Sequence, residues 1–140
     1  MEKQCKTEPF KILMQTSKNI QDQIKLEISK SDLNITEFSV LETLYYKGQQ
    51  TIHQIGNSIL ISSGSMTYVI DKLEKKDLLK RTDCPNDRRA IFIVLTPKGE
   101  ELMDKIMPEY QEFINHMFDS LNTEEAGMLI KLLQKIKTTD

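Results

Sequence analysis

The chain has 140 residues, a length that suits one compact domain, and its formal net charge is −2. Its 39% of hydrophobic residues can form a core, and its 29% of charged residues argue against global disorder. No apolar run approaches the roughly 20 residues of a membrane span, and the first ten residues lack the apolar segment of a signal peptide. Cys5 and Cys84 do not make a disulfide framework. We therefore expect a cytoplasmic protein without a membrane partner.

The charge is distributed unevenly along the chain. Residues 1–59 carry 7 basic and 7 acidic side chains, residues 60–99 carry 8 and 5, and residues 100–140 carry 4 and 9. A protein that binds nucleic acid needs local rather than global positive charge. The middle segment, at +3, is therefore the expected place for such a surface, although three charges do not establish one.

The first half of the chain has the apolar spacing of helices. From Phe10 to Ile28, apolar residues recur at three- and four-residue steps, which predicts a helix of about twenty residues with Pro9 near its first turn. Thr36 is the expected N-cap of a second helix, and Gly48 is its expected C-terminal stop. Residues 51–59 predict a short third helix.

A fourth helix and a hairpin follow. The fourth helix is predicted over residues 62–76, with Ser62 or Ser63 as its cap, and Asp77 follows where a glycine would end it more comfortably. The apolar period then changes from 3.6 to 2, which predicts strands over residues 78–82 and 91–95, joined by a turn at Pro85. The expected buried face of the fourth helix consists of Met66, Val69, Ile70 and Leu73.

Two further helices close the chain. Thr96 is an expected N-cap and Pro97 a first helical residue, and they begin a second long helix, in which Pro108 predicts a kink or a restart. Asn122 with Glu125 resembles a capping box for the last helix. The fold class is therefore mainly α with a small β-hairpin.

The third and fourth helices are compatible with a helix-turn-helix. Small hydroxyl residues near the N-terminus of the fourth helix allow close approach to base edges, and a helix N-terminus favours a phosphate. The pattern also fits an ordinary amphipathic surface helix with a serine cap. If the helix reads DNA, the candidate contacts are Ser62, Ser63, Gly64, Ser65, Thr67, Tyr68 and Lys72.

The hairpin that follows turns this arrangement into a winged helix. Arg88 and Arg89 are expected at the hairpin loop, and arginine is attracted to the negative potential of a narrow minor groove. Asp87 could fix one of the two guanidinium groups for binding. The alternative is an exposed turn with a local ion pair of little energetic value. Asp87, Arg88 and Arg89 complete the candidate DNA contacts.

The same residues resemble the signature of the MarR family of bacterial winged-helix repressors, and the resemblance extends over nearly the whole chain. Asp77 stands where the family usually has glycine, and Gly56 stands where alanine is common. The resemblance implies one MarR-like domain over residues 1–140, with a winged helix-turn-helix at 36–96 and dimerisation helices at 8–31 and 97–138. The matching motifs are Leu73-Glu74-Lys75, Leu78-Leu79-Lys80-Arg81, Asp83 with Asp87-Arg88-Arg89, and Leu95-Thr96 with Gly99.

The family resemblance also implies how the protein acts. It predicts a homodimer that binds a palindromic operator in double-stranded DNA, and a repressor that a small aromatic, phenolic or quinone-type ligand releases in a stress response. Methionine and aromatic residues at helical spacing could line the ligand pocket, although most such residues are packing residues. The candidates are Met14, Phe38, Tyr45, Met66 and Tyr110.

Two other functions stay open at this point. Cys84 lies near basic residues that could lower its thiol pKa, which suggests a repressor that senses oxidants through Cys84 or Cys5, although inert free thiols are commoner. The other alternative is a winged-helix module that binds a protein and not DNA. His53 and His116 are isolated, so no metal site is expected. No nucleophile elbow, P-loop or paired acids appear, so we expect neither an enzyme nor a cofactor.

Overall fold

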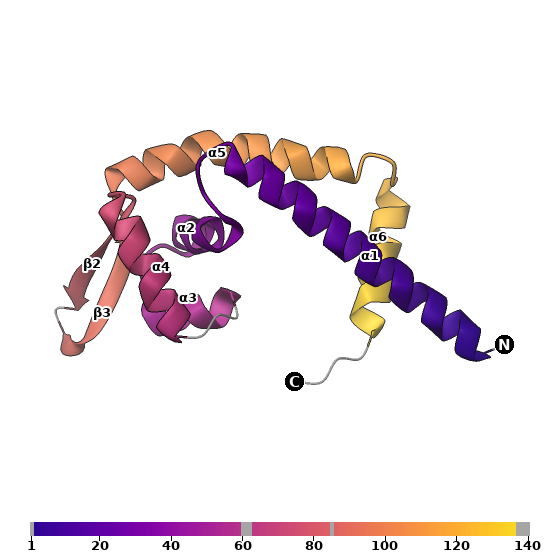
Figure 1. The fold of residues 1–140 in the computed structure, drawn as a ribbon, viewed down its shortest axis with the longest axis horizontal. Coiled ribbons are helices and arrows are strands. Elements are labelled where there is room, and N and C mark those ends of the chain that lie inside the picture. Colours follow the sequence, from indigo (N-terminus) through magenta and orange to yellow (C-terminus); the bar gives the residue numbers. More distant parts are fainter. Residues whose placement is uncertain (1, 60–62, 85, 137–140) are drawn as a thin grey trace. The chain divides into compact units, whose positions relative to one another are not determined.

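The computed structural model describes residues 2–59, 63–84 and 86–136, which form two compact units, residues 1–104 and 105–140 (Figure 1). Most of these residues are helical, and three short strands form one antiparallel sheet, so the predicted fold class is confirmed. The elements are α1 (Glu2–Ser29), α2 (Ile35–Lys47), β1 (Gln50–Thr51), α3 (Ile52–Ile59), α4 (Ser63–Lys75), β2 (Leu79–Cys84), β3 (Asp87–Leu95), α5 (Pro97–Met117) and α6 (Thr123–Lys135).

The first helix is longer than its apolar pattern predicts. α1 begins at Glu2, so Pro9 lies inside the helix and not near its first turn. The prediction was wrong there because the residues before Pro9 carry no apolar stripe that could signal a helix. Pro9 lacks the N–H that would bond one turn back, which removes one hydrogen bond of the helix.

The N-cap of the second helix lies two residues before the expected one. Asn34, and not Thr36, is the N-cap of α2: its side chain accepts a hydrogen bond from the backbone N–H of Glu37, and the Glu37 carboxylate accepts one from the N–H of Asn34. This reciprocal capping box satisfies two N–H groups, whereas Thr36 can satisfy only one. Gly48 ends the helix as predicted, with a φ of 73° and its N–H bonded to the Leu44 carbonyl.

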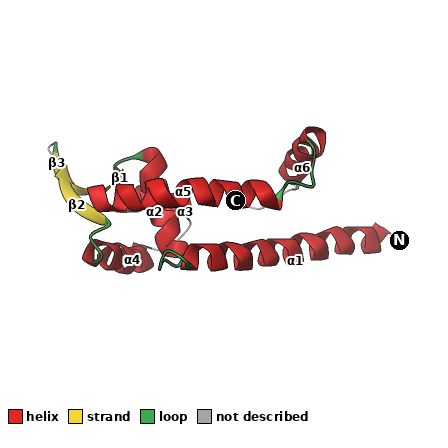
Figure 2. Cartoon of the chain, turned by 90° about the horizontal axis from the view of Figure 1, so that it is seen from above, coloured by secondary structure: helices red, strands yellow, loops and turns green. Residues whose placement is uncertain are grey.

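The sheet has the strand order β1-β3-β2, with both pairs antiparallel (Figure 2). Strand β1 was not predicted, because two residues are too few for a period of 2 to appear. The β2–β3 hairpin was predicted, but its strands extend further than the apolar alternation: the pairing continues to Cys84 opposite Asp87, past an irregularity at Asp83. Only residues 85 and 86 therefore remain between the two strands.

The core of the first unit is built by the helices α2, α3 and α4 and by the sheet. The predicted apolar face of α4 is buried, and so are Phe38, Leu41 and Leu44 of α2. Ile55 of α3 and Ile93 of β3 are fully buried. Burial of these side chains stabilises the packing of α3 and α4 against the rest of the unit, because apolar surface is removed from water and closely packed. The residues with no exposed surface are Val40, Leu41, Ile55, Met66, Ile70, Leu73, Ile93 and Met103.

A turn joins the end of α4 to the start of α5. Asp77 adopts a φ of 62°, a left-handed conformation that favours glycine, as its place after the helix led us to expect. The Thr96 hydroxyl donates to the Asp77 carbonyl at 2.5 Å and accepts from the Gly99 N–H at 3.0 Å, so Thr96 is the predicted N-cap of α5. The Thr96 N–H also donates to the Leu78 carbonyl at 3.2 Å.

Gly99 is required by this junction. A Cβ atom on residue 99 would lie 1.9 Å from the Leu78 carbonyl oxygen, a backbone atom that the hydrogen bond from Thr96 holds in place. The first turn of α5 can therefore approach the turn after α4 only because residue 99 has no side chain.

The second unit contains most of α5 and all of α6. Helix α5 passes Pro108 without ending, so the possible restart at Pro108 is wrong. Asn122 and Glu125 form the predicted capping box at the start of α6. Within the described residues, no helix is both long and apolar enough to cross a membrane.

We predict that Gly99→Ala lowers the free energy of unfolding by about 2–3 kcal/mol or more, because the backbone must move to relieve the overlap with Leu78. Gly127→Ala is the matched control. Gly127 lies inside α6 with nothing within 4 Å of an added Cβ, so alanine should stabilise the protein by about 0.5–1 kcal/mol. Urea unfolding of both variants is the measurement, and equal stability of Gly99→Ala and the natural chain would contradict the role of the close approach.

Candidate nucleic-acid interface

Helix α4 has two opposite faces. Met66, Val69, Ile70 and Leu73 point into the core as predicted, whereas the other face lies open to solvent. Tyr68 is 70% exposed, an unusual position for a large aromatic side chain. Four of the predicted contacts are exposed on the part of α4 that does not face the core, namely Ser65, Thr67, Tyr68 and Lys72.

The other candidates of this helix lie at its start. Ser63 and Gly64 form its first two residues, and the Ser63 side chain lies outside the described part of the structure. Ser62 and the rest of the segment between α3 and α4 lie outside the described residues. Their roles as contacts and Ser62 as cap stay predictions.

The hairpin carries its arginines on a strand and not in its loop. Asp87, Arg88 and Arg89 are the first three residues of β3, since the pairing of Cys84 with Asp87 leaves only residues 85 and 86 between the strands. The expected loop position was wrong because the ladder continues past the apolar part of the strands. The two arginines still lie at the far end of the hairpin. Their side chains and that of Asp87 are outside the described part of the structure.

Arg81 joins the hairpin to α4. Its guanidinium donates to the Asp71 carboxylate at 2.6 Å and to the Glu74 carboxylate at 2.5 Å, and its backbone N–H donates to Glu74 at 3.2 Å. Partial burial acts to lower the pKa of Arg81, but the hydrogen bonds and charges of the two carboxylates raise it above its ordinary value. Sequence reasoning missed this contact, although two acidic residues three apart on a helix before a basic strand were a usable signal.

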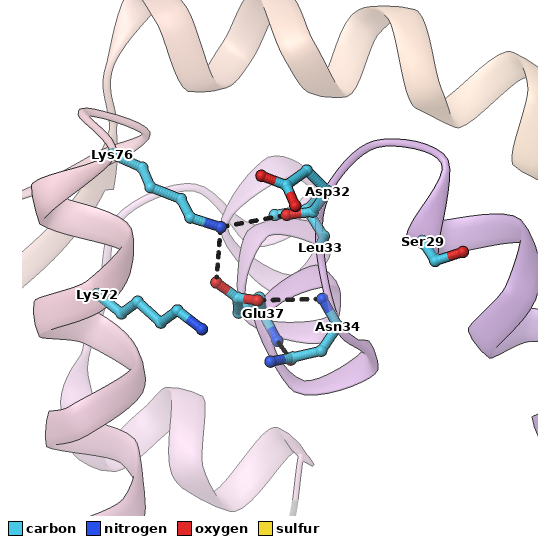
Figure 3. Close-up of a pocket in the computed structure, with 7 residues that line it drawn as sticks. All are labelled: Ser29, Asp32, Leu33, Asn34, Glu37, Lys72 and Lys76. Atoms are coloured by element: carbon cyan, nitrogen blue, oxygen red, sulfur yellow. Dashed lines mark hydrogen bonds and ion pairs between the residues drawn. The ribbon is translucent and has the colours of Figure 1, made fainter.

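Lys76 makes a second connection, between the end of α4 and the start of α2. Its ammonium group donates to the Glu37 carboxylate at 3.2 Å and to the Asp32 carbonyl at 3.1 Å (Figure 3). The Glu37 side chain is only 3% exposed, and its other oxygen accepts the Asn34 N–H of the capping box. The carboxylate is thus buried with both oxygens bonded, as a buried charge requires.

These residues border a groove of about 270 Å³. In Figure 3, Lys72 and Lys76 reach from α4 toward the corner between α1 and α2. The lining is almost wholly polar, with Leu33 as its one apolar member, so the groove suits a polar molecule better than an aromatic one. It is lined by Ser29, Asp32, Leu33, Asn34, Glu37, Lys72 and Lys76.

None of the five predicted ligand-pocket residues lines this groove. Phe38 and Met66 are buried core residues, whereas Met14 is exposed, and Tyr45 and Tyr110 are half-buried. The Tyr45 hydroxyl donates to Asp104 at 2.5 Å, and this hydrogen bond, with the negative charge of Asp104, raises the Tyr45 pKa. A pocket formed by these five residues stays a prediction.

The remaining sequence candidates have less structural support. The side chains of Cys5 and Cys84 lie outside the described part of the structure, so a redox role for either stays a prediction. His53 contacts Asn57, four residues later, and His116 contacts Asp119, three residues later, so each histidine has only a local partner among these contacts. In the part of the chain that the structure describes, no three His, Cys, Asp or Glu side chains gather in a way that could hold a metal ion.

The amino-acid sequence is similar to those of known transcriptional regulators. The sequence profile of the MarR family matches residues 33–91. The HTH-type transcriptional regulator MhqR of Bacillus subtilis is 44% identical over 127 residues, which cover 91% of this chain and 88% of MhqR.

Two solved structures have the same fold. A mutant of Escherichia coli MarR, complexed with operator DNA, aligns with a TM-score of 0.80 at 22% identity, over 93% of this chain and 94% of that one. Bordetella bronchiseptica BpsR, described with a mechanism for regulation of its DNA binding by 6-hydroxynicotinic acid, aligns with a TM-score of 0.78 at 25% identity, over 91% and 97%.

We predict that Lys76→Met destabilises the protein by about 2–3 kcal/mol, because it leaves the buried Glu37 carboxylate without its opposite charge. Lys75→Met is the control, since Lys75 is an exposed neighbour that does not line the groove. It should change the free energy of unfolding by less than about 0.5 kcal/mol. Thermal and urea unfolding compare the two, and equal effects would show that the contact with Glu37 contributes nothing.

Proposed function

Since the chain belongs to the MarR family of transcriptional regulators, we propose that it is a sequence-specific repressor that binds a palindromic operator as a homodimer. Proteins of this family regulate transcription and are not enzymes. One observation carries the proposal: the exposed polar face of α4 lies next to the β2–β3 hairpin, and Arg81 joins the two elements directly. We therefore treat α4 as the recognition helix and the hairpin as the wing.

The recognition helix fits the major groove by its chemistry. Hydroxyl groups on Ser65 and Thr67 can donate to or accept from base edges, and Tyr68 offers a hydroxyl on a long, rigid side chain. Lys72 lies two turns after Ser65 on the same face, at a distance suited to a phosphate of the backbone. This division places the base contacts near the N-terminus of α4 and the phosphate contact further along it.

The wing supplies the second set of contacts. Arg88 and Arg89 sit near the end of the hairpin, where Cys84, three residues beyond Arg81, pairs with Asp87. A strand advances about 3.3 Å per residue, so the hairpin extends roughly 10 Å past Arg81. This reach suits contact with the groove beside the one that α4 occupies, where a narrow minor groove attracts arginine.

The apolar surfaces of the two terminal regions support a homodimer. In the single chain, Phe10 of α1 is 62% exposed and Met128 of α6 is 54% exposed, in helices that each expose several more apolar side chains. Exposed apolar surface of this extent is typical of a surface that another protein chain covers. A second copy of the chain is the proposed partner, because a palindromic site needs two recognition helices. The further exposed members are Ile12, Leu13, Met14 and Leu26 of α1 and Ile130, Leu132 and Leu133 of α6, with Ile136 just after α6.

A small aromatic molecule is the proposed effector. BpsR, whose DNA binding 6-hydroxynicotinic acid regulates, shares the fold of this chain over nine tenths of its length. Met14, Tyr45 and Tyr110 retain accessible surface and are the proposed contacts, together with the buried Phe38 and Met66. The proposal places the protein in the cytoplasm, where its operator is, and assigns it to a stress response.

We predict that the pair Arg88→Ala and Arg89→Ala weakens binding to the DNA upstream of the protein's own gene by at least about 100-fold, because both groove and phosphate contacts are lost. The control is Lys18→Ala with Lys25→Ala, which removes the same charge from exposed positions on α1. Fluorescence anisotropy measures the binding, while circular dichroism and size-exclusion chromatography check the fold and the dimer. DNA binding that survives the arginine changes would contradict the role of the wing, whereas failure of the natural chain to bind the DNA would favour a winged-helix module that binds a protein instead.

A further inference from the structure

We propose that Arg81 is a positioning residue for operator binding: its guanidinium fixes the recognition helix to the wing and reduces the negative charge of two carboxylates beside the proposed DNA-reading face. This inference rests on the proposed DNA-binding function. It assigns a role to a residue that does not itself need to touch DNA.

The geometry requires an arginine. Asp71 and Glu74 lie three residues apart on α4, so their carboxylates are neighbours on the helix surface. The two terminal nitrogens of Arg81 bond to different carboxylates, at 2.6 Å to Asp71 and 2.5 Å to Glu74. A planar guanidinium can span both groups at once, whereas the compact ammonium of lysine cannot hold the same two bonds in one fixed geometry.

The strand side of this contact is rigid. Arg81 pairs with Ile93 of β3, a residue with no exposed surface that also pairs with Gln50 of β1. The backbone N–H of Arg81 also donates to Glu74, which makes three hydrogen bonds between Arg81 and α4. The backbone of β2, and not only the Arg81 side chain, is therefore attached to the helix. The contact therefore lies where all three strands are joined, and the wing extends beyond it.

The charges explain why this contact matters for DNA. Asp71 follows Thr67 by one helical turn, and its side chain is 52% exposed, so its carboxylate borders the face that reads DNA. A bare carboxylate there would repel the phosphates of an approaching duplex. With Arg81 in place, the three side chains carry a net charge of −1 in place of −2, and both carboxylates accept hydrogen bonds from the guanidinium.

The exposure of the carboxylates separates this role from a purely structural one. Ion pairs with exposed members contribute little to the stability of a fold, and the Glu74 side chain is 40% exposed. Losing Arg81 should therefore change DNA affinity far more than it changes unfolding. A residue that only stabilised the fold would show the reverse.

The test compares Arg81→Ala with Lys80→Ala in the full-length protein. Lys80 is an exposed neighbour on the same strand, so its loss removes the same charge without breaking the contact with α4. Anisotropy titrations use DNA from upstream of the protein's own gene and a scrambled duplex of equal length. We expect Arg81→Ala to bind the upstream DNA at least about tenfold more weakly than Lys80→Ala, with much of its preference over the scrambled duplex lost.

Two further variants complete the test. Arg81→Lys keeps the charge without the two-carboxylate geometry, so its affinity should lie between those of the natural chain and Arg81→Ala. Adding Asp71→Asn and Glu74→Gln to Arg81→Ala should return part of the affinity by removing the repulsion.

Equal affinities of Arg81→Ala and Lys80→Ala would overturn the inference, and so would full affinity of Arg81→Lys, which also decides the matter if Arg81→Ala does not fold. Failure of the natural chain to bind either duplex would instead overturn the proposed function and the inference with it.

Discussion

The close approach of Gly99 to the Leu78 carbonyl is the constraint on which the rest of the first unit depends. Four elements meet at this point: α4 ends, β2 begins, β3 ends and α5 begins. The Thr96 side chain connects them by accepting from one backbone segment and donating to another. Asp77 adopts a left-handed backbone conformation, which allows the chain to reverse direction between α4 and β2. A side chain at residue 99 would separate α5 from this turn and leave the Thr96 bonds unmade.

Two ionic contacts then orient α4 within that frame. Lys76, the residue that follows α4, binds the buried Glu37 of α2, and Arg81 fixes the last two turns of α4 to the hairpin. The apolar face of α4 gives the helix its stability, but apolar packing alone tolerates small rotations. Charged hydrogen bonds are directional, so they specify how the polar face is turned. In the proposed mechanism, this fixed orientation lets α4 and the wing meet neighbouring grooves together.

Local patterns predicted the elements of this fold well, and long-range contacts explain where they failed. The helix stripes, the Gly48 stop, the Thr96 cap and the hairpin each depend on residues close in sequence, which periodicity and turn chemistry describe. The extension of the hairpin to Cys84 depends on backbone pairing, which polar residues do not signal. The contacts of Arg81 and Lys76 join residues 7 to 44 positions apart. Apolar periodicity does not identify such partners, although the acidic pair on α4 was a usable signal for Arg81. The proposed DNA contacts were predicted from charge and spacing, but their arrangement on α4 and the hairpin required the fold.

The central claim is that α4 and the wing meet DNA as one unit, twice, in a homodimer. Hydroxyl-radical footprinting on the DNA upstream of the protein's own gene tests it most directly. The predicted result is two equivalent sets of protected positions with centres about one helical turn apart, each flanked by a protected minor groove. A single protected set, or uniform protection without this spacing, would contradict the account.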